Sequence, residues 1–227
     1  MNDRAIAGLY PFLASERPES TQLDQALLES ITAKATHSAQ VKQQFFAESS
    51  VQVLGAARAI ATVFRGGGRL YTMGNGGSSC DAAHIAVEFQ HPVTAGRPAL
   101  TATNLANDVA FLTAVGNDVG FKHGFLRQVS AQIRSGDGLI GISTSGNSEN
   151  LLLAFASARE IGAITIGIAG GDGGRMLQSG CLDYCLVVRS DSIHRVQETH
   201  VALYHILWDL THTLLANDRW PTARKDE

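Results

Sequence analysis

The sequence predicts an α/β fold: a doubly wound, five-stranded parallel sheet flanked by helices, preceded by a helical hairpin and followed by a long C-terminal helix. Five short apolar runs each follow a polar or glycine-rich turn, and stretches with helical periodicity lie between them. The runs are apolar at consecutive positions rather than at alternate ones. Strands of this kind are buried on both faces, as in a parallel sheet that helices cover.

The region before the first strand is predicted to be helical from residue 21 onward. Residues 1–20 mix apolar and turn residues without periodicity, so we interpret them as an N-terminal extension. Leu23, Leu27 and Ile31 then recur at helical spacing, and the pattern resumes after a polar stretch at 47–50. That polar stretch predicts a break between two antiparallel helices.

The alternation of strands and helices fills the rest of the chain. The five predicted strands are 69–74, 99–104, 138–143, 163–170 and 184–189. The predicted helices between them are 78–91, 105–115, 121–134, 147–161 and 172–179. A long amphipathic helix follows at 193–217, and 218–227 form a C-terminal tail. We expect residues 21–217, including the N-terminal helices, to form a single domain.

The composition is that of a globular protein, and it excludes several functional classes. Of the 227 residues, 44% are hydrophobic and 17% are charged, and the net charge of −3 offers no basic surface for nucleic acid or an anionic membrane. No apolar run approaches the roughly 20 residues of a membrane span, and the N-terminus lacks a signal-peptide pattern. We therefore expect neither nucleic acid nor a membrane as a partner.

The three cysteines, Cys80, Cys181 and Cys185, are an odd number in a chain large enough not to need disulfides. They predict packed free thiols and a reduced, cytoplasmic compartment. Cys181 and Cys185 are separated by three residues without a second cysteine pair, which argues against a structural zinc knuckle.

The ends of the strands are where function is expected, because ligands of open parallel sheets bind outside the carboxyl ends of the strands. The first strand ends in "MGNGGSSCDAAH", in which Asn75, Gly76 and Gly77 form a tight turn and Ser78 or Ser79 can cap the next helix. An ordinary strand-to-helix turn has the same composition. This motif alone therefore leaves the function open.

The third strand ends in "GISTSGNSEN", where four hydroxyl groups precede a helix: Ser143, Thr144, Ser145 and Ser148. One serine is enough for a helix cap, whereas four hydroxyls and the free N–H groups of a helix N-terminus suit a phosphate. The stretch contains no lysine, which excludes a Walker-type nucleotide loop. The sequence thus favours a loop that binds the phosphate group of a ligand without transferring it, rather than a loop that only caps the helix.

A third polar motif, "VGNDVGF", places Asn117 and Asp118 after an apolar segment. An Asx turn explains it equally well. By itself this motif decides nothing.

Two predicted helices carry residues suited to acid–base or metal chemistry. His84 and Glu88 are four residues apart and share one helix face, and Gln197 and His205 lie on the last helix. A carboxylate and an imidazole can move a proton next to a carbonyl group. The four side chains could equally bind one divalent ion, for which zinc suits the nitrogen and oxygen donors.

The spacing of Gln197 and His205 raises a geometric problem, because eight residues span about 12 Å of helix. Either the two side chains lean towards each other, or a second subunit supplies one of them. Two further histidines on the last helix, His200 and His212, are interpreted as buried core residues.

Four motifs together resemble one known family: "GNGGSSCDAAHIAVEF", "VGNDVGF", "GISTSGNSENLLLAFASARE" and "HRVQETHVALYHIL". In this order they are similar to the sugar isomerase (SIS) domain family and, within it, to the phosphoheptose isomerases. The resemblance covers residues 25–217. It implies the SIS fold, a homotetramer with sites at subunit interfaces, and conversion of sedoheptulose 7-phosphate into D-glycero-D-manno-heptose 7-phosphate through a cis-enediol.

The resemblance also implies roles for individual residues. Substrate contacts fall at Asn75, Gly76, Gly77, Glu88, Asn117, Asp118 and Gln197. Phosphate contacts fall at Ser143, Thr144, Ser145 and Ser148. Glu88 and His205 match the catalytic acid–base pair. The zinc ligands of some family members match His84, Glu88, Gln197 and His205, and the resemblance implies no nucleotide or organic cofactor.

Two features depart from the family pattern. His194 stands where the similar isomerases tend to have aspartate, which bears on the choice of sugar, and the N-terminal extension is longer. Two alternative functions remain: a non-catalytic SIS tetramer that binds the replication initiator, and an isomerase of another phosphosugar. Glu88 and His205 favour an enzyme, because a binding module has no need of the pair.

Overall fold

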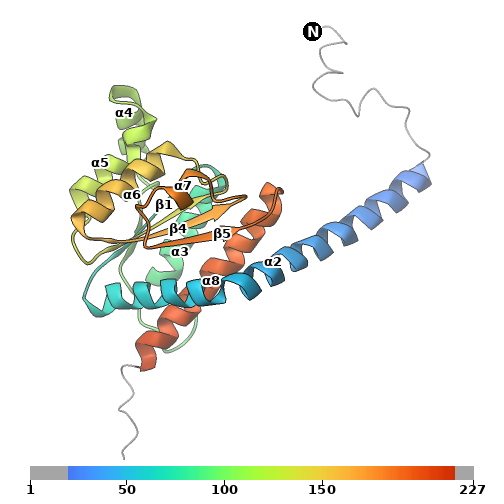
Figure 1. Cartoon of the computed structure of the whole chain (residues 1–227), viewed down its shortest axis with the longest axis horizontal. Helices are drawn as coiled ribbons and strands as arrows, with labels where there is room; N and C mark the ends of the chain where they lie inside the picture. Colours follow the sequence, from blue (N-terminus) through green and yellow to red (C-terminus); the bar gives the residue numbers. More distant parts are fainter. Residues whose placement is uncertain (1–19, 218–227) are drawn as a thin grey trace, which may run out of the picture. The chain divides into compact units, whose positions relative to one another are not determined.

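The structure, a computed structural model, describes residues 20–217 and confirms the predicted parallel α/β architecture (Figure 1). One five-stranded parallel sheet has the strand order β2-β1-β3-β4-β5. Its strands are β1 (Leu70–Gly74), β2 (Ala102–Asn104), β3 (Gly138–Ser143), β4 (Ile164–Gly170) and β5 (Tyr184–Val188). Every predicted strand is present, and the bounds differ from the prediction by three residues at most.

Helices connect the strands close to the predicted positions. They are α2 (Ser20–Arg65), α3 (Gly77–Gln90), α4 (Val109–Asp118), η2 (Phe121–His123), α5 (Gly124–Gln132), α6 (Glu149–Ile161), α7 (Gly174–Gln178) and α8 (Ile193–Asn217). None of the helices within residues 20–217 has the length and apolar character that crossing a membrane requires.

The chain divides into two compact units, Met1–Ala39 and Gln40–Glu227, whose boundary falls inside α2. The predicted extension, 1–20, lies outside the described residues except for Ser20, and so does the predicted tail, 218–227. The extent of the predicted domain, 21–217, stays a prediction.

Two hydrophobic cores lie on the two faces of the sheet. Ile140 and Ile142 of β3 join one core with α3, α8 and the C-terminal part of α2, whereas Leu139 joins the other with α5 and α6. Figure 1 shows α5 and α6 on one side of β4 and β5, and α8 on the other. Successive side chains of a strand point to opposite faces of the sheet, and each face is covered by a core. The side chains on both faces must therefore be apolar. This explains the continuous apolar runs in the sequence.

The predicted helical hairpin is wrong, because α2 continues without a break through residues 47–50. That stretch is polar but contains neither glycine nor proline, and its two serines cost a helix only tenths of a kcal/mol each. The one glycine of α2, Gly55, has a packing reason. A Cβ atom at Gly55 would lie 2.7 Å from Cε1 of Tyr184, so the ring of this β5 residue packs directly on the helix backbone.

The strand order places the switch point of the sheet at β1. The chain moves from β1 to β2 on one side and then returns to form β3 on the other side. The carboxyl ends of β1 and β3 therefore flank the crevice at which open α/β sheets bind their ligands. We call the segment 75–79 after β1 the first tail, and the segment 143–148 after β3 the phosphate loop.

Candidate active site

A reciprocal amide pair joins the first tail to α6. The Nδ2 group of Asn75 donates to Oδ1 of Asn150 (2.9 Å), and the Nδ2 group of Asn150 donates to Oδ1 of Asn75 (2.9 Å). Asn150 is buried, with 4% of its surface exposed, and its Oδ1 also accepts the N–H of Leu151 (3.1 Å). The sequence analysis missed Asn150. Its signal is an amide on the buried face of an otherwise apolar helix turn.

The phosphate loop presents its hydroxyl groups at an α6 N-terminus that no side chain caps. Ser148 is the N-cap residue but makes no side-chain cap hydrogen bond; its Oγ lies 2.9 Å from Oγ of Ser143 instead. Thr144 is half-buried and Ser145 is exposed. Oδ1 of Asn150 accepts the N–H of Leu151, but Ser148 caps none of the first-turn N–H groups, so those of Glu149 and Asn150 can bind an anion together with the hydroxyls.

The backbone of the α7 region holds the phosphate loop in one conformation. Gly146 has φ +65°, and a Cβ atom there would collide with the carbonyl oxygen of Gly173. The carbonyl oxygen of Gly146 accepts the N–H of Met176 (2.8 Å), and Oδ1 of Asn147 accepts the N–H of Arg175 (3.0 Å). The loop is therefore preorganised by contacts outside the sheet.

The first tail forms the predicted tight turn, but its serines do not cap α3. The N-cap residue is Gly76, without a side-chain cap bond, and Ser78 and Ser79 lie inside the first turn. The turn closes through the backbone, where the N–H of Ser78 donates to the carbonyl of Asn75 (3.0 Å). The predicted serine cap is wrong because the helix begins one residue earlier than expected.

Helices α3 and α8 run side by side in the same direction. A Cβ atom at Gly77 would lie 2.6 Å from Nε2 of Gln197, so the two residues touch. Further along, His84 contacts Tyr204, and Nε1 of Trp208 donates to the carbonyl oxygen of Glu88 (2.8 Å). Every one of these pairs is 120 residues apart in the sequence. We call this line of contacts the α3–α8 seam.

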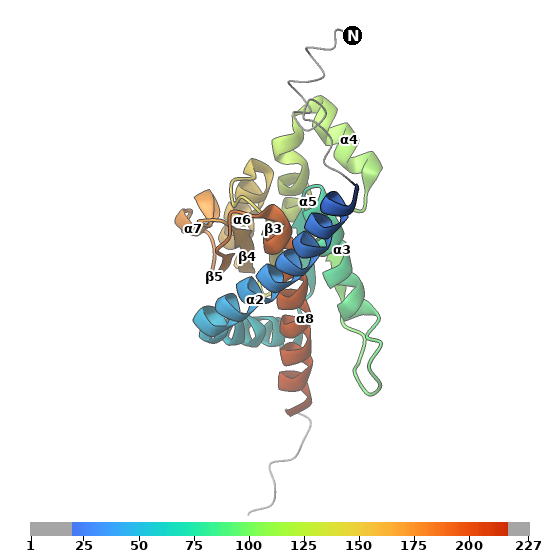
Figure 2. The ribbon, with the colours of Figure 1, turned by 90° about the vertical axis from the view of Figure 1, so that its right-hand side faces the viewer.

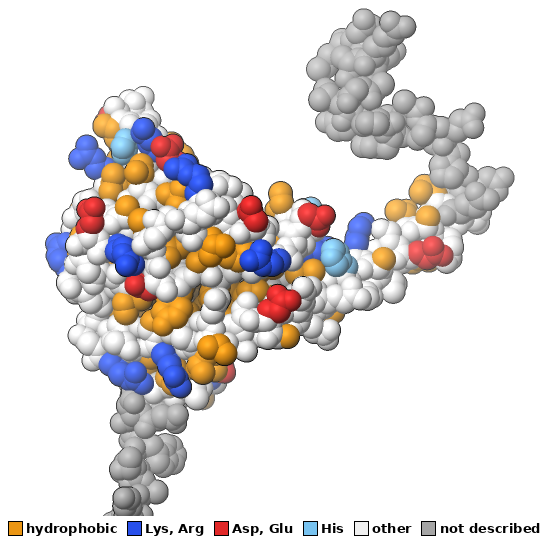
Figure 3. Space-filling model, viewed as in Figure 1, with side chains coloured by type: hydrophobic (Ala, Val, Ile, Leu, Met, Phe, Trp, Pro, Cys, Tyr) orange, Lys and Arg blue, Asp and Glu red, His pale blue; other side chains and the backbone are white. Residues whose placement is uncertain are grey.

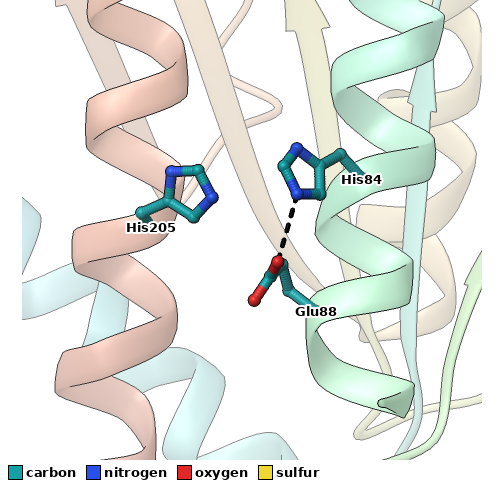
Figure 4. A group of neighbouring side chains, drawn as sticks. All are labelled: His84, Glu88 and His205. Carbon is teal, nitrogen blue, oxygen red and sulfur yellow. Dashed lines mark hydrogen bonds and ion pairs between the residues drawn. The ribbon is translucent and has the colours of Figure 1, made fainter. Parts of the chain in front are cut away.

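His84, Glu88 and His205 converge on the α3–α8 seam, as Figure 4 shows. One ligand atom from each of the three side chains lies within 4.8 Å of the other two. Nε2 of His84 lies 3.1 Å from Oε1 of Glu88, and the two imidazole centroids are 5.1 Å apart. The side chain of His84 is 43% exposed and that of Glu88 is 17% exposed. A small molecule can therefore reach the group.

Two further polar side chains lie beside this group. The hydroxyl oxygen of Tyr204 is 2.8 Å from Nδ1 of His84. Burial raises the pKa of Tyr204 to about 12, so it is a neutral hydroxyl at physiological pH. Burial also raises the pKa of Asp81, one helical turn before His84, although the nearby His84 acts against that shift. The sequence analysis gave Tyr204 no role.

The three converging side chains fit a zinc ion. Two histidines and a glutamate offer nitrogen and oxygen donors, and three protein donors with an open fourth position are typical of catalytic zinc. Donor atoms on a tetrahedral zinc lie about 3.4 Å apart, so small side-chain rotations would close the 4.8 Å group around the ion. The fourth predicted ligand, Gln197, lies against Gly77, about 12 Å before His205 along α8.

Asn117 and Asp118 are not brought to the seam or to the phosphate loop within one chain. Both are exposed on the last turn of α4, where Nδ2 of Asn117 donates to Oδ1 of Asp118 (2.9 Å). Within residues 20–217, the side chains of Asn117 and Asp118 make no hydrogen bond besides this one. Helix α4 packs on η2 and α5 and stands away from α8 in Figures 1 and 2.

His200 and His212 are buried, as predicted for core histidines. Nε2 of His200 donates to the carbonyl oxygen of Ala169 (3.1 Å), and the ring of His212 stacks on Phe89 at a centroid distance of 5.9 Å. Burial lowers the pKa of His200 to about 4. Neither histidine belongs to the converging group.

Residues 35–170 match the sequence profile of the SIS domain. The chain belongs to the SIS domain family. Within this family, the chain is similar to a protein from Desulfovibrio desulfuricans named phosphoheptose isomerase, and the two sequences are 43% identical over 190 residues. That alignment covers 83% of this chain and 89% of the relative.

Two solved structures of phosphoheptose isomerases share the SIS fold of this chain. The protein from Neisseria gonorrhoeae superimposes with a TM-score of 0.76 at 36% identity, covering 82% of this chain and 99% of that one. The protein from Francisella tularensis superimposes with a TM-score of 0.78 at 34% identity, covering 82% and 98%. At these identities the similarity extends beyond the fold to the sequence.

Proposed function

We propose that this protein is a phosphoheptose isomerase that interconverts sedoheptulose 7-phosphate and D-glycero-D-manno-heptose 7-phosphate. The observation that carries the proposal is the convergence of His84, Glu88 and His205 in a chain 43% identical to a phosphoheptose isomerase. An acid–base pair is what an aldose–ketose isomerisation requires.

The phosphate loop anchors the ester end of the substrate. Its hydroxyls and the uncapped N-terminus of α6 supply hydrogen-bond donors and a favourable helix dipole. Asn75, Gly76 and Gly77 line the neighbouring first tail and contact the sugar. Gln197, which touches Gly77, extends these contacts onto α8. Asn117 and Asp118 complete the proposed substrate contacts, but they require a second copy of the chain, because within one chain they lie on α4.

Glu88 and His205 act as the acid–base pair. One of them removes a proton from C1 of the ketose while O2 receives a proton, which gives the cis-enediol. A proton is then delivered to C2 and one is lost from O1, which leaves the aldehyde of the aldose. Each step is worth roughly 10²- to 10⁴-fold in rate when the groups are held within hydrogen-bond reach.

A zinc ion would be held by His84, Glu88 and His205, with Gln197 as the fourth protein ligand if a second copy of the chain supplies it, because within one chain Gln197 lies about 12 Å before His205 along α8. When bound, the ion polarises the carbonyl and hydroxyl oxygens and stabilises negative charge on the enediol oxygens. The support for it is the donor set and its spacing.

The dimensions of the substrate support an assembly in which copies share the site. Glu88 lies eleven residues after Gly77, which at ~1.5 Å per residue is about 16 Å along α3. A heptose 7-phosphate has eight bonds from C1 to phosphorus and spans about 10 Å when extended, at ~1.2 Å per bond. We infer that the phosphate loop of one copy serves the Glu88 and His205 of another copy, in the homotetramer that the resemblance implies.

Exposed apolar side chains on the N-terminal part of α2 also support this assembly. Leu23, Leu27, Leu28 and Ile31 are 43–64% exposed and fall on one helix face. Figure 3 shows hydrophobic side chains along this part of the surface. A helix of the size of residues 20–39 with an exposed apolar stripe is stabilised by a partner that covers the stripe.

The cytoplasm is the proposed compartment. All three cysteines are free thiols, and burial raises the pKa of Cys185 to about 11, which keeps it an unreactive thiol. Free thiols of this kind suit a reduced environment.

The experiment that tests the function is hydrogen–deuterium exchange followed by NMR. The protein is incubated in D2O with sedoheptulose 7-phosphate, with fructose 6-phosphate and with ribulose 5-phosphate, before and after treatment with a chelator. We expect deuterium to enter at C1 of the heptulose and the aldose to form, with loss of both after chelation and recovery on adding zinc. Faster deuterium incorporation into the hexose or pentose phosphate than into the heptulose phosphate would identify an isomerase of another phosphosugar. The first substitution to test for an effect on the choice of sugar would then be His194→Asp. No exchange, with tight binding of the replication initiator, would identify the non-catalytic alternative.

A further inference from the structure

The imidazole of His84 is held at both of its nitrogen atoms. Nε2 lies 3.1 Å from Oε1 of Glu88, and Nδ1 lies 2.8 Å from the hydroxyl oxygen of Tyr204. The Tyr204 ring also packs edge-on against the imidazole, with centroids 5.3 Å apart and an interplanar angle of 72°. A flip of the His84 ring would break both hydrogen bonds.

The chemistry of the two partners assigns the proton on the ring. An ionised carboxylate only accepts hydrogen bonds, so Nε2 of a neutral His84 donates to Glu88. Nδ1 then carries a lone pair and accepts the O–H of Tyr204. Only 3% of Tyr204 is exposed, so water does not compete for this contact. Among residues 20–217, His84 is the hydrogen-bond partner of the Tyr204 hydroxyl.

We propose that Tyr204 is a positioning residue: its hydroxyl fixes the orientation of the His84 ring so that Nε2 faces Glu88 and His205. A hydroxyl can donate or accept, so it would keep its bond to Nδ1 if the ring proton moved from Nε2 to Nδ1 and left the lone pair of Nε2 free for a metal. Phenylalanine would fill the same volume without this hydrogen bond. The consequence for catalysis rests on the proposed function, whereas the effect on the ring does not.

The next turn of α8 holds α3 in a similar way. Nε1 of Trp208 donates to the carbonyl oxygen of Glu88 (2.8 Å), so Tyr204 and Trp208 fix the side chain of one site residue and the backbone of another. Asp81, one turn before His84 on α3, makes no hydrogen bond through its buried Oδ2 among the described residues. Tyr204 is thus the side chain through which Nδ1 of His84 is held.

The test compares Tyr204→Phe with Tyr71→Phe. Tyr71 is equally buried, at 3% exposed, and donates to the carbonyl oxygen of Gln132 (3.2 Å), so its variant loses a comparable hydrogen bond away from the seam. Long-range ¹H–¹⁵N NMR spectra of the metal-free, full-length proteins at pH 8 report the tautomer of each histidine. The His84 signal, one of eight, is assigned from its loss in His84→Gln. Zinc affinity is measured by competition with a chromogenic chelator.

We expect the metal-free wild type to show His84 with its proton on Nε2, and the His84 signals of Tyr204→Phe to be broadened by motion of a ring that is held at one nitrogen only. Zinc affinity should fall roughly 10- to 100-fold in Tyr204→Phe, with a lower kcat and little change in KM, whereas Tyr71→Phe should match the wild type. Equal zinc affinity and an unchanged His84 spectrum in Tyr204→Phe would overturn the proposal.

The wild-type spectrum can refute the proposal even if Tyr204→Phe does not fold. A proton on Nδ1 of His84, or a rapidly exchanging ring, in the metal-free wild type would refute the assignment. Both readouts are independent of isomerase activity. A protein that leaves sedoheptulose 7-phosphate unchanged but shows the expected spectrum and zinc affinities would refute the proposed function and keep the role of Tyr204.

Discussion

Glu88 contacts both helices of the seam, because its carboxylate meets His84 and its backbone carbonyl accepts the indole N–H of Trp208. The side chain is therefore held in place before any ligand arrives. We predict that Glu88→Gln, which keeps the size of the side chain and removes its basicity, lowers kcat roughly 10²- to 10⁴-fold. Binding of the phosphorylated sugar, measured by calorimetry, should persist because the phosphate loop is unchanged.

Glu160→Gln is the matched control for this variant. Glu160 is an exposed residue of α6, so the same chemical change there should leave kcat near that of the wild type. Near wild-type turnover in Glu88→Gln would remove Glu88 from the catalytic pair. Equal losses in both variants would point to a general effect on folding.

His200 makes the stability of the protein depend on pH. Its folded pKa of about 4 lies below the ordinary value of 6.5, because burial disfavours the charged ring. Between pH 6.5 and 4 the unfolded chain binds the extra proton, so the free energy of unfolding falls as the pH falls through this window. Between pH 7 and pH 5 we expect this residue to account for a loss of about 2 kcal/mol.

The measurement is urea unfolding at pH 5, 6 and 7 with fixed protein concentration. His200→Gln keeps a donor towards Ala169 but does not titrate, so its stability should change less with pH than that of the wild type. Parallel pH profiles for the two proteins would contradict the assignment, because the other ionisable groups are common to both.

At the residue scale, the sequence predicted the chemistry of the site better than its supports. His84 and Glu88 share a helix face by spacing alone, so this pair could be predicted. Tyr204 and Asn150 could not, because each meets a partner far away in the sequence. Their roles depend on how α8 packs along α3 and on how β1 lies beside β3. The spacing of residues within one helix or strand does not predict how two such elements pack against each other.

At the scale of elements, the strands were predictable and the break in α2 was not. A strand buried on both faces must be apolar throughout, which leaves a clear mark on the sequence. Glycine and proline are the strongest signals of a turn between helices, and the polar stretch at 47–50 has neither. Polarity alone marks solvent exposure. It does not mark the end of a helix.

The Asn75–Asn150 pair connects the elements on either side of the switch point. We predict that Asn150→Ala lowers the free energy of unfolding by about 1–3 kcal/mol, because it leaves the Asn75 amide without its partner. The first tail and the phosphate loop would also lose their fixed spacing, which should raise KM several-fold. Urea unfolding and steady-state kinetics measure the two effects.

Asn107→Ala is the comparison for Asn150→Ala. Oδ1 of Asn107 accepts from Nδ2 of Asn104 (2.9 Å) after β2, so the variant loses an amide contact that does not join the first tail to α6. We expect a change in stability without a change in KM. Equal effects on KM in the two variants would show that the Asn75–Asn150 pair has no special part in spacing the site.

At the scale of the whole molecule, we predict that the proposed site is complete only when chains associate. Glu88 lies about 16 Å along α3 from Gly77, farther than the length of a heptose phosphate, which supports the proposal that the phosphate loop and the acid–base pair come from different copies. Activity and assembly should therefore be lost together. An enzyme with a site inside one chain would keep its activity on dissociation.

This coupling can be tested on the exposed face of α2. Leu27→Glu combined with Ile31→Glu places two charges in the apolar stripe. Leu27 is 53% exposed and Ile31 is 64% exposed. We predict that light scattering after size exclusion shows a loss of the four-chain species and that isomerase activity falls with it. Ala33→Glu combined with Thr36→Glu adds the same charge to exposed positions on the opposite face of the helix and should leave both unchanged. Dissociated chains that retain full activity would mean that each chain holds a complete site, and the shared arrangement would have to be abandoned.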